Sequence, residues 1–279
     1  MERNIINGKH NNSITMPAPT YNGTYTFSDG STSGWGIQEI TSNTVTSTFT
    51  VNSGDLIIVF SGTSDYDEDS SRFSIPSVSD NYNLRWEIVS VNAGTNQYCP
   101  LICWQAINTY QTSITLTVSI NLSISVSSSV RFGGQAFSFS FADGIGFTFN
   151  SIGASVANNN SVSVTPFRGQ SAMFYYLLDW ESWSMPDRTF NTNNGFAPTE
   201  LTYQDTGNNT VVGLLYQNVV DGTLTITTAN VLKYTVMAVE IMGVASGVGS
   251  PGILPPIIAP GSPSVTNVST ITNISTLTI

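Results

Sequence analysis

The sequence has few charged residues and a single histidine. Asp, Glu, Lys and Arg make up 9% of the 279 residues, against roughly 25% in typical soluble domains. The formal net charge is -10, and the only lysines are Lys9 and Lys233, so no basic stripe exists that would neutralise nucleic-acid phosphates. The one histidine, His10, lies in a polar N-terminal segment, which leaves no metal–histidine centre and no Ser-His-Asp triad. We therefore predict a protein that is not an enzyme, needs no cofactor and binds no nucleic acid.

Cysteines and long apolar runs are also scarce. Cys99 and Cys103 stand four residues apart in a predicted strand, which places them about 13 Å apart on one face and beyond disulfide reach. We interpret them as buried thiols. The N-terminal residues MERNIINGKHNNS contain no apolar core of a signal peptide, and no run is long enough to cross a bilayer. The sequence as given predicts neither a secretion signal nor a membrane span.

The strongest pattern that is present is the alternation of β-strands. From 113 to 127 the even positions are aliphatic and the odd positions are Ser, Thr or Asn, which predicts a long strand with one buried and one solvated face. The run from Leu56 to Phe60 is apolar at every position, as in a strand buried on both faces. Helical periodicity is absent. These patterns predict an all-β, two-sheet β-sandwich of jelly-roll-like topology.

The segments that flank the strand-rich region differ in composition. Residues 1–34 are polar and turn-rich and are predicted to form an extended N-terminal arm, and residues 35–243 form the predicted β-sandwich domain. Residues 244–263 are a linker rich in Pro and Gly. Residues 264–279 form a C-terminal tail that repeats an apolar side chain at every third position and is too short to bury these side chains against itself. We predict that the tail binds another subunit through its apolar side chains, Val268, Ile271, Ile274 and Leu277. The alternative is a disordered tail.

The second half of the sandwich domain resembles the first in pattern. The stretch 45–60 can be aligned with 160–175, and 136–141 can be aligned with 237–242. The match is one of alternation more than of identity, and any two sandwich halves share alternation. Internal duplication is therefore one of two interpretations, the other being two unrelated halves with the same strand pattern.

An acidic loop is the candidate metal site. Asp65, Asp67 and Asp69 alternate as in the first half of a calcium loop, but Ser70 and Pro76 stand where such a loop needs Gly and Glu. A solvated acidic loop is the favoured interpretation and a calcium ion the alternative. Glycan stacking on the nearby Tyr66, or on Trp180 and Trp183, is a further alternative.

Several Asn-x-Ser/Thr sequons are candidate glycosylation sites, all in predicted arms, turns, solvated strand faces or the tail. They begin at Asn11, Asn22, Asn121, Asn159, Asn208, Asn267 and Asn273.

Three stretches resemble a family of β-sandwich surface proteins of acidothermophilic archaea and their viruses; they read TFTVNSGDLIIVFSG, CPLICWQAINTYQTSITLTVSI and LKYTVMAVEIMG. The resemblance implies a structural subunit, such as a jelly-roll capsid, turret or spike protein on the surface of a virion, whose partners are copies of itself and other subunits. The alternatives are a subunit of a glycosylated cell-surface filament joined by donor-strand exchange, and an adhesin that binds a host glycan or receptor. The missing signal peptide favours the virion, and the many sequons favour the filament.

The low density of charged residues predicts that the stability of the fold depends little on pH. Because the surface consists of hydroxyls and amides more than of ion pairs, we expect the melting temperature to change little between neutral pH and about pH 3. Calorimetry across this range is the measurement. A steep loss of stability within the titration range of Asp and Glu would contradict the prediction.

Overall fold

The computed structural model describes the greater part of the β-sandwich domain, and every regular element in it is a strand. The described residues are 17–29, 37–40, 42–65, 75–92, 101–122, 130–153, 158–166, 171–179, 190–193, 197–205, 210–219, 223–231 and 234–244. The predicted all-β class is confirmed.

The strands form four antiparallel sheets, which we name by their place in the molecule. Inner sheet I has the order β1 (Thr20–Thr26), β9 (Val130–Ser140), β4 (Leu56–Asp65), β7 (Leu101–Ile107) and β6 (Glu87–Asn92), and β2 (Ile37–Glu39) also pairs with β9. Outer sheet I is β3 (Thr44–Val51), β8 (Ile114–Asn121) and β5 (Ser77–Asp80). Inner sheet II is β10 (Ala142–Gly153), β17 (Tyr234–Gly243), β12 (Ser171–Asp179), β15 (Thr210–Val219) and β14 (Thr199–Asp205). Outer sheet II is β11 (Asn158–Val164), β16 (Leu224–Val231) and β13 (Phe190–Thr192).

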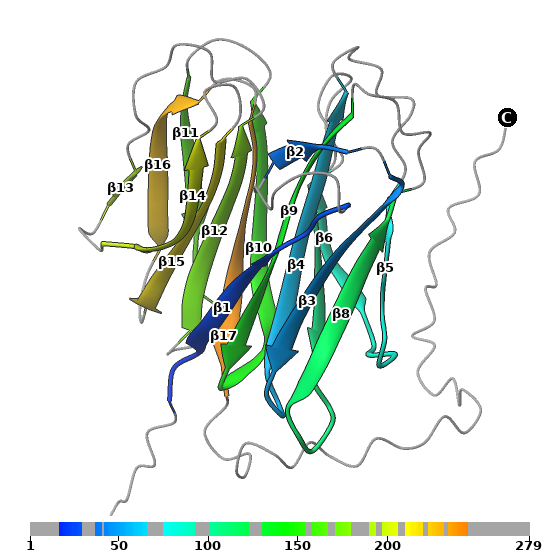
Figure 1. Cartoon of the computed structure of the whole chain (residues 1–279). Helices are drawn as coiled ribbons and strands as arrows, with labels where there is room; N and C mark the ends of the chain where they lie inside the picture. Colours follow the sequence, from blue (N-terminus) through cyan, green and yellow to red (C-terminus); the bar gives the residue numbers. More distant parts are fainter. Residues whose placement is uncertain are drawn as a thin grey trace, which may run out of the picture.

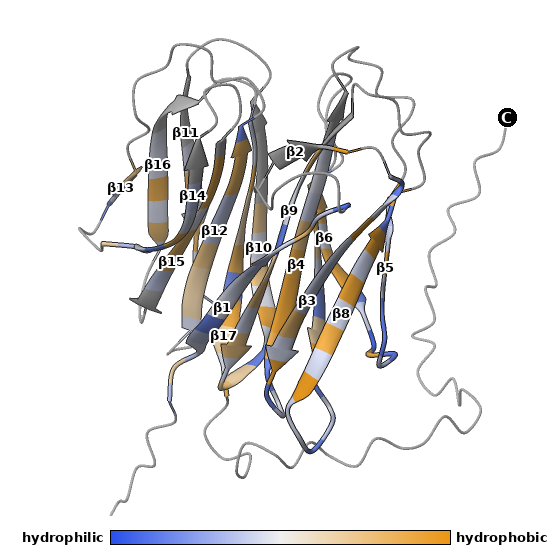
Figure 2. Cartoon of the chain, in the orientation of Figure 1, coloured by the Kyte–Doolittle hydropathy of each residue, from blue (hydrophilic) through white to orange (hydrophobic). Residues whose placement is uncertain are grey.

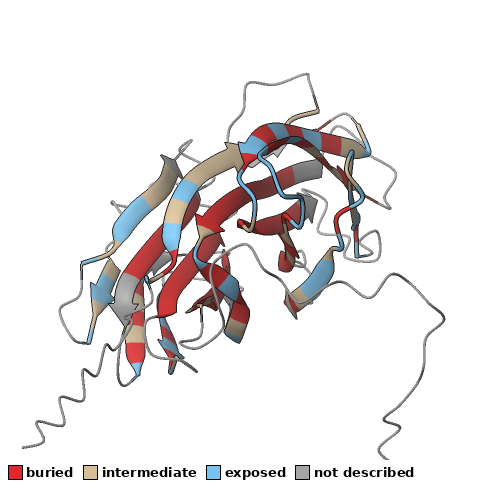
Figure 3. Ribbon diagram, turned by 90° about the horizontal axis from the view of Figure 1, so that it is seen from below, coloured by how far each residue is buried: buried red, intermediate tan, exposed pale blue. Residues whose placement is uncertain are grey.

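The four sheets are stacked as layers, with outer sheet II at the left and outer sheet I at the right of Figure 1. Three hydrophobic cores separate the layers. The structure therefore contains two sandwiches placed back to back, where the sequence predicted two sheets in all. The central strands of the inner sheets, such as β7, β12 and β17, are buried over most of their length and appear as red ribbons in Figure 3.

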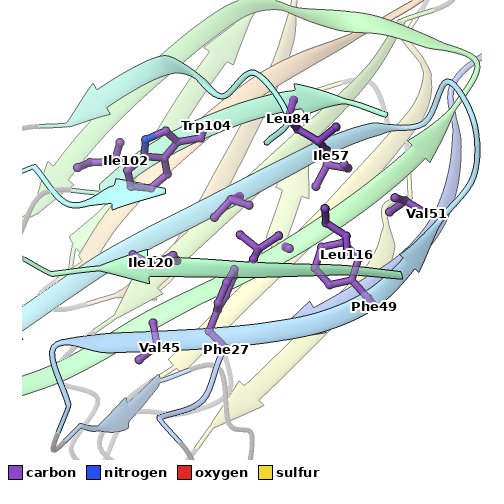
Figure 4. Packing of buried hydrophobic residues seen from close by; sticks show 14 of the residues in the cluster. Phe27, Val45, Phe49, Val51, Ile57, Leu84, Ile102, Trp104, Leu116 and Ile120 are labelled. Atoms are coloured by element: carbon purple, nitrogen blue, oxygen red, sulfur yellow. The ribbon is translucent and has the colours of Figure 1, made fainter. Parts of the chain in front are cut away.

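β4 explains why the layers continue on both sides of inner sheet I. Ile57 and Val59 face the first core, between inner and outer sheet I, as Figure 4 shows for Ile57. Ile58 and Phe60 face the middle core, between the two inner sheets. The prediction that the apolar run is buried on both faces is confirmed, since Leu56 to Phe60 are all 0% exposed.

Aromatic side chains fill the middle core. The Phe60 and Tyr176 rings stack with their centroids 4.5 Å apart, and the Phe137 and Phe174 rings meet edge to face at 4.5 Å. Burial raises the pKa of the Tyr176 phenol well above its ordinary value. These rings join the two sandwiches, so the two halves share one core and are not independent domains.

The strand predicted at 113–127 corresponds to β8 in its described part. Its core face carries Leu116, Val118 and Ile120, and hydroxyl side chains alternate with them, which Figure 2 shows as alternating orange and pale bands. β8 is regular from Ile114 to Asn121, and residues 123–129 lie outside the described part. It lies in an outer sheet, so it covers the first core and is not the centre of the fold.

β1 lies within the segment predicted to be an extended arm. It pairs with β9 along its whole length, and Tyr25 stacks on Phe49 with ring centroids 4.0 Å apart. The sandwich therefore includes residues from Thr20 onward, because Tyr21 and Tyr25 pack against the middle and first cores. The remainder of the arm up to Met16 lies outside the described residues.

The two halves of the molecule have the same strand order. Apart from β2, which has no counterpart, each strand of inner sheet I takes the same place in sequence and sheet as a strand of inner sheet II, from β1 and β10 to β6 and β14. A side-chain contact is also repeated. Asn81 binds the backbone of Thr115 and Thr117 in β8. In the same way Asn193 binds the backbone of Thr223, just before β16, and of Thr225 within it. That the halves arose by duplication stays a prediction.

The residue-by-residue match between the halves does not fit the observed faces in two stretches. The alignment of the two halves pairs Ile57 with Ala172 and Ala136 with Met237. Ile57 and Ala136 face the first core, whereas Ala172 and Met237 face the middle core. A slip of one residue exchanges the two faces of a strand, and the alternation is equally good in either register when both faces are apolar.

The shared middle core predicts how the halves respond to a cavity. Phe60→Ala should lower the free energy of unfolding by about 3–5 kcal/mol, because it removes a fully buried ring that touches Phe137, Phe174 and Tyr176. Denaturation followed by tryptophan and tyrosine signals should remain a single transition. Exposed Phe141→Ala is the control, and separate melting of the two halves would show that the middle core does not join them.

Candidate functional site

The outward faces of both outer sheets carry hydroxyls and amides. Cross-strand pairs satisfy some of these groups, among them Thr48 with Thr117 at 3.0 Å and Ser163 with Thr225 at 2.8 Å. Among the described outward side chains none is charged or aromatic. They are Thr46, Thr48, Thr50, Ser77, Ser79, Thr115, Thr117, Ser119 and Asn121 on outer sheet I, and Ser161, Ser163, Asn191, Thr225 and Thr227 on outer sheet II.

The border strands of both inner sheets are interrupted by β-bulges. The strand register shifts around Asn22 in β1, Val89 in β6, Gly146 in β10 and Leu201 in β14. A bulge breaks the row of backbone donors and acceptors that another strand would need. The inner sheets are thereby protected against edge-to-edge pairing.

β3 has a regular register, and among the described residues its second edge carries one isolated bridge, to Ser28. Its register with β8 runs without a shift, and on its other edge Thr46 exchanges two backbone hydrogen bonds with Ser28, at 2.9 and 2.8 Å. The backbone groups of Thr48 and Thr50 point to the same edge, because strand residues alternate in direction. A strand added along this edge would therefore extend the pairing between Ser28 and Thr46 toward Thr48 and Thr50.

A buried carboxylate holds the bulge of β1. Asp55 is 2% exposed, and it accepts hydrogen bonds from the Asn52 backbone at 2.9 Å, the Asn22 amide at 3.1 Å and the Ser140 hydroxyl at 2.7 Å. The β3–β4 turn, β1 and the end of β9 thus meet at one side chain. Its role is structural, since all these donors belong to the fold.

A second buried carboxylate holds the bulge of β10. Glu240 is 0% exposed and accepts from the Ser171 hydroxyl at 2.6 Å and from the Phe147 backbone at 3.0 Å. A side chain at Gly146 would collide with this carboxylate, so glycine is required there. Asp55 and Glu240 therefore shape border strands, and sequence reasoning had not identified them. Asp179, the last residue of β12, is a third buried acid at 0% exposure.

The predicted acidic loop is only partly within the described residues. Asp65 is the last residue of β4, and Asp67 and Asp69 lie outside the described part, as do Tyr66, Trp180 and Trp183. The described residues contain no group of three or more His, Cys, Asp or Glu side chains that would hold a metal ion. The calcium site stays a prediction.

The sequons fall in different settings. Asn121 lies on the outward face of β8, where its side-chain oxygen accepts from the Thr44 hydroxyl at 3.0 Å and its amide nitrogen donates to the exposed Ser79 hydroxyl at 3.4 Å. Asn22 donates from its amide nitrogen both to Asp55 and to Ser140, at 3.1 and 2.7 Å. The backbone of Asn159 lies in β11. Asn11, Asn208, Asn267 and Asn273 lie outside the described residues.

Two further predictions concern the cysteines and the tail. Cys103 is buried in the middle core, and burial raises the pKa of its thiol, so the prediction of a buried thiol is confirmed for this residue. Cys99 lies outside the described part. The tail with Val268, Ile271, Ile274 and Leu277 also lies outside it, and its binding to another subunit stays a prediction.

No helix in the described part of the chain is long and apolar enough to span a membrane. Comparison with protein-family models, with curated proteins and with solved structures gave no match for this chain. Its function must therefore be argued from its own surfaces.

The Asn22 contacts predict that this sequon carries no glycan in the folded protein, because a glycan would displace a proton that the amide donates. Peptide mass spectrometry of the glycosylated protein is the measurement. Asn22→Ala should lower the free energy of unfolding by about 1–3 kcal/mol, since it leaves Asp55 short of a donor. Asn121→Ala is the matched control with a smaller expected loss, and a fully glycosylated Asn22 in a stable protein would contradict the assignment.

Proposed function

We propose that the protein is a non-enzymatic structural subunit of an extracellular assembly, and that this assembly is the surface of a virion. The observation that carries the proposal is the pair of uncharged outer faces on opposite sides of one layered molecule. Net charge keeps proteins apart, and a chain with a net charge of -10 presents no charge on these faces in the described residues. Copies can approach through them without like-charge repulsion.

The strand order supports a jelly-roll-like topology for each half. Counting β1, β3, β4, β5, β6, β7, β8 and β9 as first to eighth, inner sheet I places the first, eighth, third and sixth side by side, and outer sheet I the second, seventh and fourth. This is the neighbour order of a jelly roll with its fifth strand moved beside the sixth. Jelly rolls build viral capsids and also lectin domains, and a rigid layered body suits a shell.

The chemistry of the described residues supports a structural role. The two buried acids described above accept hydrogen bonds from the fold itself, as does Asp80, which binds the backbone of Tyr82 and Leu84. The ion pair between Arg85 and Glu87, 2.9 Å long, lies on the surface. Asp55, Glu240 and Asp80 are thus occupied by hydrogen bonds that hold the fold.

A filament subunit joined by strand exchange is the second candidate. The regular, partly open edge of β3 favours it, because an incoming strand would continue the pairing that Ser28 begins. The C-terminal tail is the proposed donor in that case, as it is the proposed contact between virion subunits.

The test is assembly of the full chain. Light scattering and electron microscopy of the purified protein should show particles or filaments, and mass spectrometry of native material should show whether the chain travels with a genome or with envelope filaments. Thr48→Glu, which places a charge on outer sheet I, should abolish assembly, and Thr20→Glu on exposed β1 is the matched control.

Removal of the residues after Ser262 should leave a folded protein that no longer assembles. A full chain that stays monomeric under all conditions in which the native particle forms would contradict the proposed function. A truncated chain that assembles normally would contradict the role of the tail alone.

A further inference from the structure

Two loops at the lower end of the first half in Figure 1 bring a pair of tyrosines together. Tyr82 lies between β5 and β6, and Tyr110 lies between β7 and β8. Their ring centroids are 5.2 Å apart with an interplanar angle of 72°. The Tyr110 hydroxyl donates to the Tyr82 carbonyl at 2.9 Å, and Tyr110 remains 41% exposed.

The first loop is held by Asp80. Its carboxylate accepts from the Tyr82 backbone at 2.6 Å, from the Leu84 backbone at 3.0 Å and from the Trp86 indole nitrogen at 2.7 Å. Asn83 takes a left-handed conformation with φ of 57°, which Asn adopts more readily than most residues. Tyr82 therefore has a fixed position.

The second loop is held by Asn108, which is 0% exposed. Its amide donates to the Asn52 carbonyl at 2.8 Å, and its side-chain oxygen accepts from the Tyr110 backbone at 3.0 Å. Both rings are thus in place before any ligand arrives, which lowers the entropy lost on binding.

Tyr110 is not part of the first hydrophobic core, so packing does not explain its fixed position. Tyr82, Leu84 and Trp86 pack against the first core, but Tyr110 is not part of that cluster. Its hydroxyl is bound to the neighbouring backbone, so the group it offers to solvent is its ring. A ring that is exposed, fixed by a hydrogen bond and not used by the core is available to stack on a ligand.

The residues beside the rings limit the chemistry of the ligand. Asn83 and Gln111 are exposed and offer amide donors and acceptors. The cation of this tip, Arg85, is paired with Glu87 at 2.9 Å. A phosphate or an acidic peptide would find no unpaired counter-charge in these two loops.

We propose that the Tyr82–Tyr110 tip binds a neutral glycan. The apolar C–H face of a pyranose would stack on the Tyr110 ring, and the Asn83 and Gln111 amides would bind its hydroxyls. The site lies at the end of the sandwich and not on the outer faces. It therefore does not depend on the proposed assembly, and a monomer should bind as well as a particle.

The experiment uses the full chain and a glycan array that contains neutral and acidic oligosaccharides, followed by saturation-transfer NMR with the methyl glycosides of glucose, mannose and galactose. We expect binding of neutral glycans. Tyr110→Ala should weaken it by about tenfold, the value of one aromatic contact, with a melting temperature near that of the parent protein. Tyr110→Phe should retain most of the binding because the ring remains.

Two controls keep the outcome clear. Phe147→Ala removes an aromatic side chain of similar exposure, 42%, elsewhere on the surface and should not change binding. Gln111→Ala should weaken binding without removing a ring, which covers the case in which Tyr110→Ala fails to fold. No binding of neutral glycans, binding of acidic glycans alone, or equal binding by Tyr110→Ala and the parent would overturn the proposal.

Discussion

The structure depends on two central strands that are buried on both faces. β4 and β12 contribute alternate side chains to different cores, so each inner sheet must be covered on two sides. An outer sheet covers one side, and the second inner sheet covers the other. The four layers follow from this constraint, and the aromatic contacts of Phe60 and Phe174 in the middle core make the two halves one body.

The buried carboxylates of Asp55 and Glu240 stabilise β-bulges in the border strands of the inner sheets. Long regular edges would pair with other chains, and both acids bind the bulged segment of a first strand, at Asn22 in β1 and at Phe147 in β10. Burial of a carboxylate is unfavourable unless hydrogen bonds compensate it. Here one donor to each carboxylate, Asn22 or Phe147, comes from the bulged strand itself, and the others come from neighbouring segments.

The surfaces divide into two chemical kinds. The described outward side chains of the outer sheets are uncharged, and several of their hydroxyls bind one another, which suits contacts between copies of the chain. The tip with Tyr82 and Tyr110 carries fixed rings with amide neighbours, which suits a small polar ligand with an apolar face. The two kinds lie on different parts of the first half, so assembly and recognition do not compete for the same residues.

Local alternation determined much of this protein by itself. It identified β8, the two-sided burial of Leu56 to Phe60 and the all-β class, because a period of two depends only on neighbouring residues. Alternation states which side chains are buried but not which sheet buries them, so only the tertiary structure decided that there are four layers and which face of β12 meets which core. The same holds for the polar clusters. Asp55 meets Asn22 and Ser140, and Tyr82 meets Tyr110, through pairings between strands distant in sequence, and no local pattern records those pairings.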